Sequence, residues 1–238
     1  MGTSSARRPP TTWLWRRAKG AATRYLAPSG GVALEAREVV ARYLAALGEE
    51  TGPGGQGSLA GFRLTRKAGQ NLGAFSSEVA SQGWDAALEA WGLAGLTEPS
   101  GAMAVPLLAG ALLEADGSLE DAVAHSALAA VLQDFRTLEK AAPVQMVARF
   151  LSEALYQRLV LDLGESLEAA CGSYGHWRQG LAGLKDWIIR SGALAEGADP
   201  PIARQWRGLA GWQWVTLALE KMLARLLESP SDISGKSD

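Results

Sequence analysis

The chain has a single cysteine, Cys171, and lacks any long hydrophobic run among its 238 residues. One thiol cannot form an intramolecular disulfide, which excludes the class of secreted domains stabilised by disulfide bonds. The longest apolar stretch, residues 99–113, contains Pro106 and is shorter than the roughly 20 residues that a membrane-spanning helix needs. We therefore expect no transmembrane helix, no membrane partner and a cytoplasmic location.

Acidic side chains are missing from the first 34 residues. Residues 1–82 contain eleven Lys and Arg and five Glu, a net charge of +6, and the total of −2 leaves −8 for the remainder. This asymmetry indicates that the basic part faces an anionic partner, or that the two parts attract each other within the fold or between protomers. An Arg-rich start without acids also superficially resembles an organellar transit peptide.

Alternating strand patterns are almost absent, and apolar residues recur at helical spacings of three and four. We predict an all-α fold, an irregular multi-helix bundle with flexible N- and C-terminal tails. Residues 49–58, EETGPGGQGS, have the composition of a linker. The predicted organisation is a flexible tail over 1–10, a basic helical segment over 11–48, the linker over 49–58, a helical core domain over 59–228 and a tail over 229–238.

Glycine, proline and capping residues set the expected ends of the helices. We expect Gly48 to stop the second helix, Gly69 and Gly73 to interrupt the next, and Gly164 to end or bend a long helix that begins at Pro143. The predicted ranges are 11–26, 34–47, 62–79 as one helix or a pair, 84–91, 100–115 with a bend at Pro106, 118–135 with a capping box from Ser118, 143–163, 177–190, and a last helix opened by residues 199–201.

No group of residues typical of catalysis or of metal binding emerges from the sequence. Cys171 and His176 lie five apart on a glycine-rich turn, but a structural zinc site needs four ligands and only His125 could add a third. As nucleophile and base, the same pair lacks a third group to orient it. Residues 235–237, Gly-Lys-Ser, match only the end of a phosphate loop, because Pro230 occupies the position of its first glycine. We therefore expect no catalytic residue, no metal ligand, no cofactor and no enzymatic activity in this chain alone.

The first five residues, Met1-Gly2-Thr3-Ser4-Ser5, offer a different kind of site. Gly2 is small enough for Met1 to be removed, which leaves a glycine amine with a pKa near ~7.7 to 8.0 and a neutral, nucleophilic fraction at cellular pH. N-myristoylation would need Ser or Thr at position six, where this chain has Ala6. An unmodified, disordered tail is the plain alternative.

A basic segment that carries tryptophan follows these residues. As a helix, it is expected to place Trp13, Leu14, Ala18, Ala21 and Tyr25 on one face. Its cations would suit an acidic partner, the protein's own acidic portion or nucleic-acid phosphates, although no groove-reading motif accompanies them. The candidate partner-binding residues are Thr3, Ser4, Ser5, Trp13, Trp15, Arg16, Arg17, Lys19 and Arg24.

Four segments together carry a resemblance to a known family. They are Met1-Gly2-Thr3-Ser4-Ser5, Trp15-Arg16-Arg17-Ala18-Lys19, the hairpin LLAGALLEADGSLEDAVAHSALAAVL, and the helix from Arg149-Phe150-Leu151 to Tyr156-Gln157-Arg158. In these segments the chain resembles the QatB family, the B component of the four-gene Qat anti-phage defence systems.

The resemblance implies a non-catalytic adaptor that works beside an ATPase, a TatD-like nuclease and a QueC-like enzyme, of the kind that joins nitrogen to 7-deazaguanine chemistry. It further implies that the mature N-terminal glycine, here Gly2, is the group that is modified. The alternative function is a nucleic-acid-binding accessory protein that uses the basic N-terminal segment. A third hypothesis is an organellar helical protein with a cleaved transit sequence.

Overall fold

The computed structural model describes residues 12–27, 35–50, 59, 61–96, 104–114, 116–133, 142–193 and 201–228. These ranges contain helices and no strand, which confirms the all-α class. The elements are α1 (Trp13–Tyr25), α2 (Ala36–Glu50), α4 (Arg63–Gln82), α5 (Trp84–Ala90), α6 (Ala104–Leu112), α7 (Leu119–Leu132), α9 (Pro143–Glu168), α10 (Tyr174–Ser191), the 3₁₀ turn η1 (Ala203–Gln205) and α11 (Leu209–Leu227).

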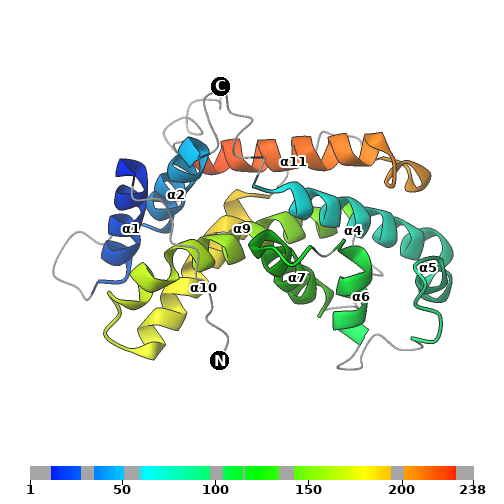
Figure 1. Ribbon diagram of the computed structural model, residues 1–238, viewed down its shortest axis with the longest axis horizontal. Coiled ribbons are helices and arrows are strands. Elements are labelled where there is room, and N and C mark those ends of the chain that lie inside the picture. The colour runs from blue at the N-terminus through cyan, green and yellow to red at the C-terminus, as the bar shows by residue number, and fades with distance from the viewer. Residues whose placement is uncertain are drawn as a thin grey trace, which may run out of the picture.

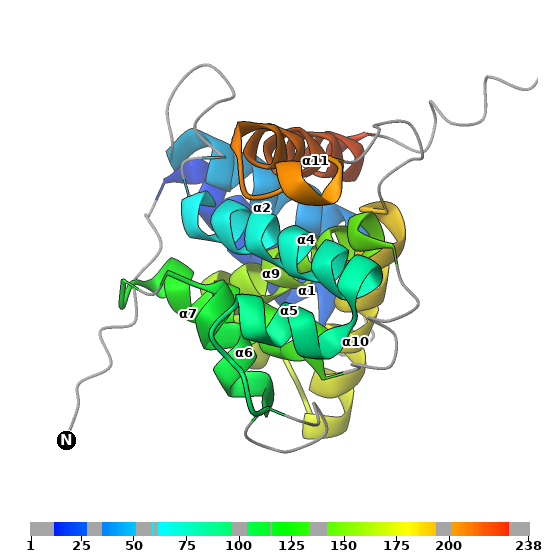
Figure 2. The ribbon, with the colours of Figure 1, turned by 90° about the vertical axis from the view of Figure 1, so that its right-hand side faces the viewer.

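Helix α9 is the central element of the bundle (Figure 1). It packs against α1, α4, α7, α10 and α11, so apolar residues are buried around much of its circumference. Pro143 is its first residue, as predicted, because the first turn of a helix needs no N–H from that position. Seen from the side, α11 and α4 lie above α9, and α5, α6 and α7 lie towards the viewer (Figure 2).

Helices α1 and α2 share one continuous hydrophobic core with the helices that follow residue 59. Helix α1 packs on α2 and α9, and α2 also contacts α10 and α11. The face of α2 that meets this core carries Val39, Val40, Tyr43 and Leu47, which are all buried. Of the predicted linker, Glu49 and Glu50 belong to the last turn of α2, and residues 51–58 lie outside the described residues.

The glycines predicted to stop or bend helices lie inside continuous helices instead. Gly48 is within α2, Gly164 is within α9, and α4 runs unbroken through Gly69 and Gly73. The physical reason at Gly73 is close packing, because a Cβ there would lie 2.3 Å from the buried ring of Trp206. Tertiary contacts on the rest of each helix outweigh the helix-forming cost of about 1 kcal/mol per glycine.

Several other helix ends differ from the sequence expectation. Pro106 is the third residue of α6, where the missing N–H costs nothing and no bend is needed. Ser118 caps α7 by accepting a hydrogen bond from the Asp121 N–H, as predicted, but that helix ends at Leu132. Helix α10 begins at Tyr174, and α11 begins only at Leu209, after the η1 turn.

Charged side chains also hold the bundle together from within. Arg158 and Asp162 form an ion pair of 3.0 Å between side chains that are 5% and 6% exposed. The Tyr43 hydroxyl donates to the same Asp162 oxygen at 2.8 Å, which joins α2 to α9. Because these groups are removed from water, each depends on the others for its polar contacts.

Helix α4 begins without a capping side chain of its own. The carboxylate of Glu120, from α7, instead accepts the Thr65 N–H at 3.0 Å. Burial raises the pKa of Glu120 above its ordinary value of 4.5. Because it accepts this N–H, the Glu120 carboxylate caps α4 from a neighbouring helix.

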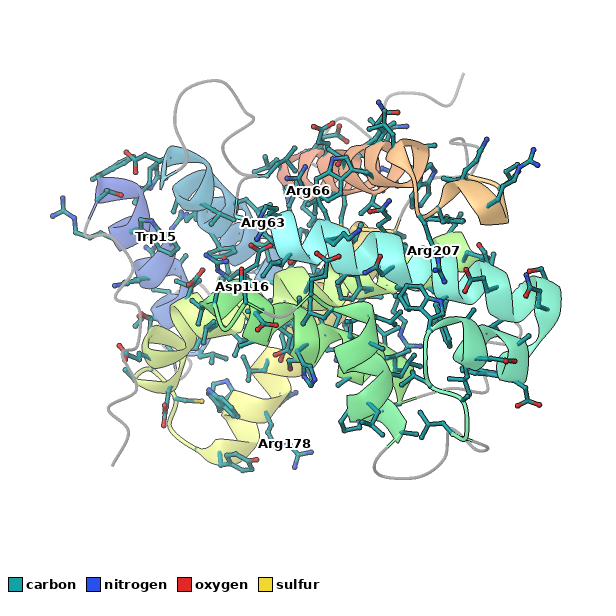
Figure 3. All side chains as sticks on the ribbon, turned by 45° about the vertical axis from the view of Figure 1, so that its right-hand side comes forward. Trp15, Arg63, Arg66, Asp116, Arg178 and Arg207 are labelled. Carbon is teal, nitrogen blue, oxygen red and sulfur yellow. The ribbon has the colours of Figure 1, made fainter. Side chains whose placement is uncertain are left out.

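Some basic residues of the first 82 pair with acidic residues from the rest of the same molecule. Arg63 pairs with Asp116 at 3.4 Å and Lys67 pairs with Glu114 at 3.8 Å, so α4 bonds to the acidic residues just before α7 (Figure 3). These pairs support the expectation that the basic and acidic parts attract each other within one molecule. The cations of α1, in contrast, make no ion pair with a described residue.

Candidate partner-binding surface on helix α1

The start of α1 is tied to the end of α2. Thr12 caps α1, because its hydroxyl oxygen accepts the Trp15 N–H at 3.5 Å. The same hydroxyl donates to the Glu49 carboxylate at 2.7 Å. The chain that precedes Thr12 therefore joins the bundle at a fixed point. The predicted modification site Gly2 and its neighbours Thr3, Ser4 and Ser5 lie outside the described residues.

The inner face of α1 is made of Trp15, Ala18, Ala21 and Ala22, all buried. Trp15 is 1% exposed and meets the ring of Tyr43 edge to face, with centroids 5.9 Å apart (Figure 3). Of the face expected from the sequence, Ala18 and Ala21 are buried and Leu14 and Tyr25 pack partly buried against the core, but Trp13 is 58% exposed. The Trp15 side chain therefore belongs to the core, whereas the Trp13 ring is exposed on the surface of α1.

The far end of α1 is anchored on α10. The Tyr25 hydroxyl donates to the Gly180 carbonyl at 3.0 Å, and burial raises the pKa of this phenol. Leu26 packs so closely on Gly180 that a Cβ there would lie 2.0 Å from its Cδ2. Because both ends are held, α1 presents a fixed outer surface.

We call the outer surface of α1 the arginine stripe, made of Trp13, Arg16, Arg17 and Arg24, which are all exposed. The Arg17 guanidinium lies 4.6 Å from the Trp13 ring, and Arg24 donates to the Gly20 carbonyl at 3.2 Å. Within the described ranges, neither these arginines nor the half-buried Lys19 pair with a carboxylate. The predicted cations thus lie together on an anchored helix, and no carboxylate of the described residues neutralises them.

Sequence reasoning also missed Arg207, which the fold places on an aromatic ring. Its guanidinium lies 4.4 Å from the Trp91 ring and pairs with Glu78 at 2.9 Å, and the Trp91 indole donates to the same carboxylate at 2.6 Å (Figure 3). These residues come from α4, the end of α5 and the turn before α11. Because they are far apart in the chain, no short sequence motif predicts that they meet in one cluster. All its polar groups have partners, and it joins these elements together.

The candidate metal ligands of the sequence are placed in ordinary structural roles. The Cys171 thiol donates to the Ser173 carbonyl at 3.3 Å, and the His176 N–H donates to the Ser173 hydroxyl, which caps α10. In the part of the chain that the structure describes, no three His, Cys, Asp or Glu side chains gather where they could hold a metal ion. None of the described helices is both long and apolar enough to span a bilayer.

One comparison with known proteins identifies the family of this chain. A model of the QatB family, described as Qat anti-phage system associated protein QatB, matches residues 54–191. This is more than half of the chain, which therefore belongs to the QatB family and is a component of the Qat anti-phage system. No curated protein and no solved structure matches the chain. The match begins after α1 and α2, so the arginine stripe lies outside it.

Proposed function

We propose that this protein is a non-catalytic adaptor of the Qat system, whose mature N-terminal glycine, Gly2, is presented to and modified by a QueC-like partner enzyme. The observation that carries the proposal is the anchoring of α1. Membership of the QatB family implies association with other components of the system, and an ATPase and a TatD-like nuclease complete the proposed set.

The distance from Gly2 to the anchored cap is suited to delivery into another protein. Ten residue steps separate Gly2 from Thr12. Fully extended, that length spans at most about 33–36 Å. The glycine is thus able to enter a partner's active site while the partner rests on the outer surface of α1.

The chemistry of the glycine also supports the proposal. With Met1 removed, its amine has a pKa near ~7.7 to 8.0, so roughly a tenth is neutral and nucleophilic at pH 7. When the neutral amine attacks an activated carbon held by the partner, an N–C bond forms, the activating group leaves that carbon with its bonding electrons, and the nitrogen loses one proton to solvent. The small side chains of Thr3 and Ser4 leave the approach open. The activated group comes from the partner, so the chain itself needs no catalytic residue.

Intact-mass measurement of the protein co-expressed with its system tests this proposal. We expect a mass above that of the chain without Met1, with fragmentation placing the addition on Gly2. Gly2→Pro, which offers only a secondary amine, should lose the addition, whereas Gly2→Ala should keep a primary amine and part of the modification. An unmodified mass, together with phage protection that survives Gly2→Pro, contradicts the proposal.

The docking role of the arginine stripe is tested by reversing its charge. Arg24→Glu should lower the modified fraction without changing the unfolding temperature. Arg190→Glu is the matched control, because Arg190 is an exposed arginine on α10 that likewise donates to a carbonyl of its own helix, at 3.3 Å. Equal effects of the two substitutions would remove the stripe from the proposal.

The unneutralised arginines favour one second candidate, a nucleic-acid-binding accessory protein. Three phosphate contacts on a single strand give a salt slope of about −2.1, so affinity should fall roughly 18-fold when salt rises fourfold. Binding of a fluorescent oligonucleotide between about 50 and 200 mM salt measures this slope. Binding that is absent, or indifferent to both salt and Arg16→Glu, rejects the candidate.

A further inference from the structure

A pocket of about 380 Å³ opens where α9 ends and α10 begins. Small-molecule and side-chain sites commonly start at a volume of roughly 300 Å³. The described residues that line this pocket are Glu168, Cys171, Gly172, Ser173, Tyr174 and Trp177.

One wall of the pocket is a pair of stacked aromatic rings. Tyr174 and Trp177 lie one helical turn apart on α10, with centroids 5.8 Å apart and planes inclined by 24°. Tyr174 is 72% exposed, the most exposed of the large apolar side chains described. A tyrosine ring left in water beside a second ring and a cavity offers a ready stacking surface.

The pocket has the charge of a cation site. Glu168 is its one charged group among the described lining residues, and it makes no ion pair with a described residue. The faces of aromatic rings also carry negative potential. The opposing dipole of α10 is moderated in part by Ser173, whose hydroxyl oxygen accepts the N–H of His176, the third residue of that helix.

A guanidinium already lies near the aromatic wall. The Arg178 guanidinium is 6.0 Å from the Tyr174 ring, at the outer limit of a cation–π contact (Figure 3). Arg178 is exposed and is not among the residues that line the pocket. Arg178 therefore shows that a guanidinium is able to approach the face of the Tyr174 ring. Its side chain does not fill the pocket.

We infer that this pocket binds the guanidinium of an arginine side chain supplied by a partner protein. A guanidinium is planar, so it stacks on the Tyr174 and Trp177 rings, and its paired N–H groups match the Glu168 carboxylate. The neutral isostere citrulline keeps the shape but loses the charge. The inference is independent of Gly2 and stands or falls without it.

Titration of the full-length protein with N-acetyl-arginine amide tests the inference. The indole N–H of Trp177 is the reporter in ¹H–¹⁵N spectra, because it is buried without an acceptor among the described residues. Its signal is assigned with Trp177→Phe. We expect a saturable shift of Trp177, no shift of the Trp13 indole on α1, and no shift with N-acetyl-citrulline amide.

Substitutions identify the groups responsible. Glu168→Gln and Tyr174→Ala should each weaken binding about two- to fivefold, the effect of losing one exposed ion pair or one exposed cation–π contact. Both residues are exposed, so the fold should persist by circular dichroism. Arg178→Gln should strengthen binding, because it removes a positive charge that lies 6.0 Å from the Tyr174 ring and repels an incoming guanidinium. Citrulline binding equal to that of arginine, no saturable shift, or weaker binding in Arg178→Gln would each overturn the inference.

Discussion

Gly73 and Gly164 each lie inside a long helix, and replacing Gly73 by alanine should give a less stable protein than replacing Gly164 by alanine. A Cβ at Gly164 meets nothing within 4 Å, so Gly164→Ala should gain the full helix preference of alanine, about 1 kcal/mol. A Cβ at Gly73 would lie 2.3 Å from two ring atoms of Trp206, and ordinary contacts begin at 3.4 Å. The ring would therefore have to move by about 1 Å.

Trp206 has little freedom to make that movement. Its side chain is fully buried, it meets Trp214 edge to face at 5.3 Å, and its carbonyl accepts from the Gln70 amide at 2.8 Å. Forcing extra volume into such a core costs about 1–3 kcal/mol. Because the helix preference is common to both variants, the difference between them isolates this cost.

Urea unfolding followed by circular dichroism at 222 nm measures both variants against the native protein. We expect Gly73→Ala to be about 1–3 kcal/mol less stable than Gly164→Ala. For a chain of this size, that difference corresponds to roughly 2–12 °C in unfolding temperature. A Gly73→Ala protein as stable as Gly164→Ala would refute the close packing of Trp206 on α4.

Three further predictions concern the buried polar groups and the orientation of α1. Asp162→Asn should cost about 3–5 kcal/mol in urea unfolding because it removes the carboxylate that pairs with the buried charge of Arg158, and a loss below about 1 kcal/mol would contradict that ion pair. Burial raises the pKa of Glu120 in the folded state, so its contribution to stability is present below pH 4.5 and is lost as pH rises through the raised value. Stability curves measured between pH 4 and 7 should therefore show Glu120→Gln gaining on the native protein as pH increases, and a pH-independent difference would oppose this. Trp15→Ala should cost about 3–5 kcal/mol and Trp13→Ala less than about 0.5 kcal/mol, and similar values would mean that α1 is oriented differently.

The helices themselves were accessible from the sequence because each carries its own apolar periodicity. The starts of α7 and α9 were found from Ser118 and Pro143, whose effects on a helix terminus are local. The stops assigned to Gly48 and Gly164 were wrong because a glycine inside a helix costs only about 1 kcal/mol. Packing along the rest of the helix exceeds that cost.

The candidate site was also predictable from the sequence only in part. Composition and spacing alone identified the basic segment and its cations, but they could not separate Trp13 from Trp15. That choice depends on which side of α1 meets Tyr43, a residue of a different helix. The Thr12–Glu49 contact that anchors the start of α1 and the Tyr174–Trp177 wall beside Glu168 were likewise invisible.

By itself, the sequence determined the all-α class, the approximate positions of most helices and the acid-free start of the chain, because periodicity, capping and charge are properties of short segments. Only the tertiary structure decided which glycines are close contacts, which tryptophan is core and which cations remain unpaired. Those outcomes depend on the distance between residues that are far apart in the chain, and that distance is set by how the helices pack.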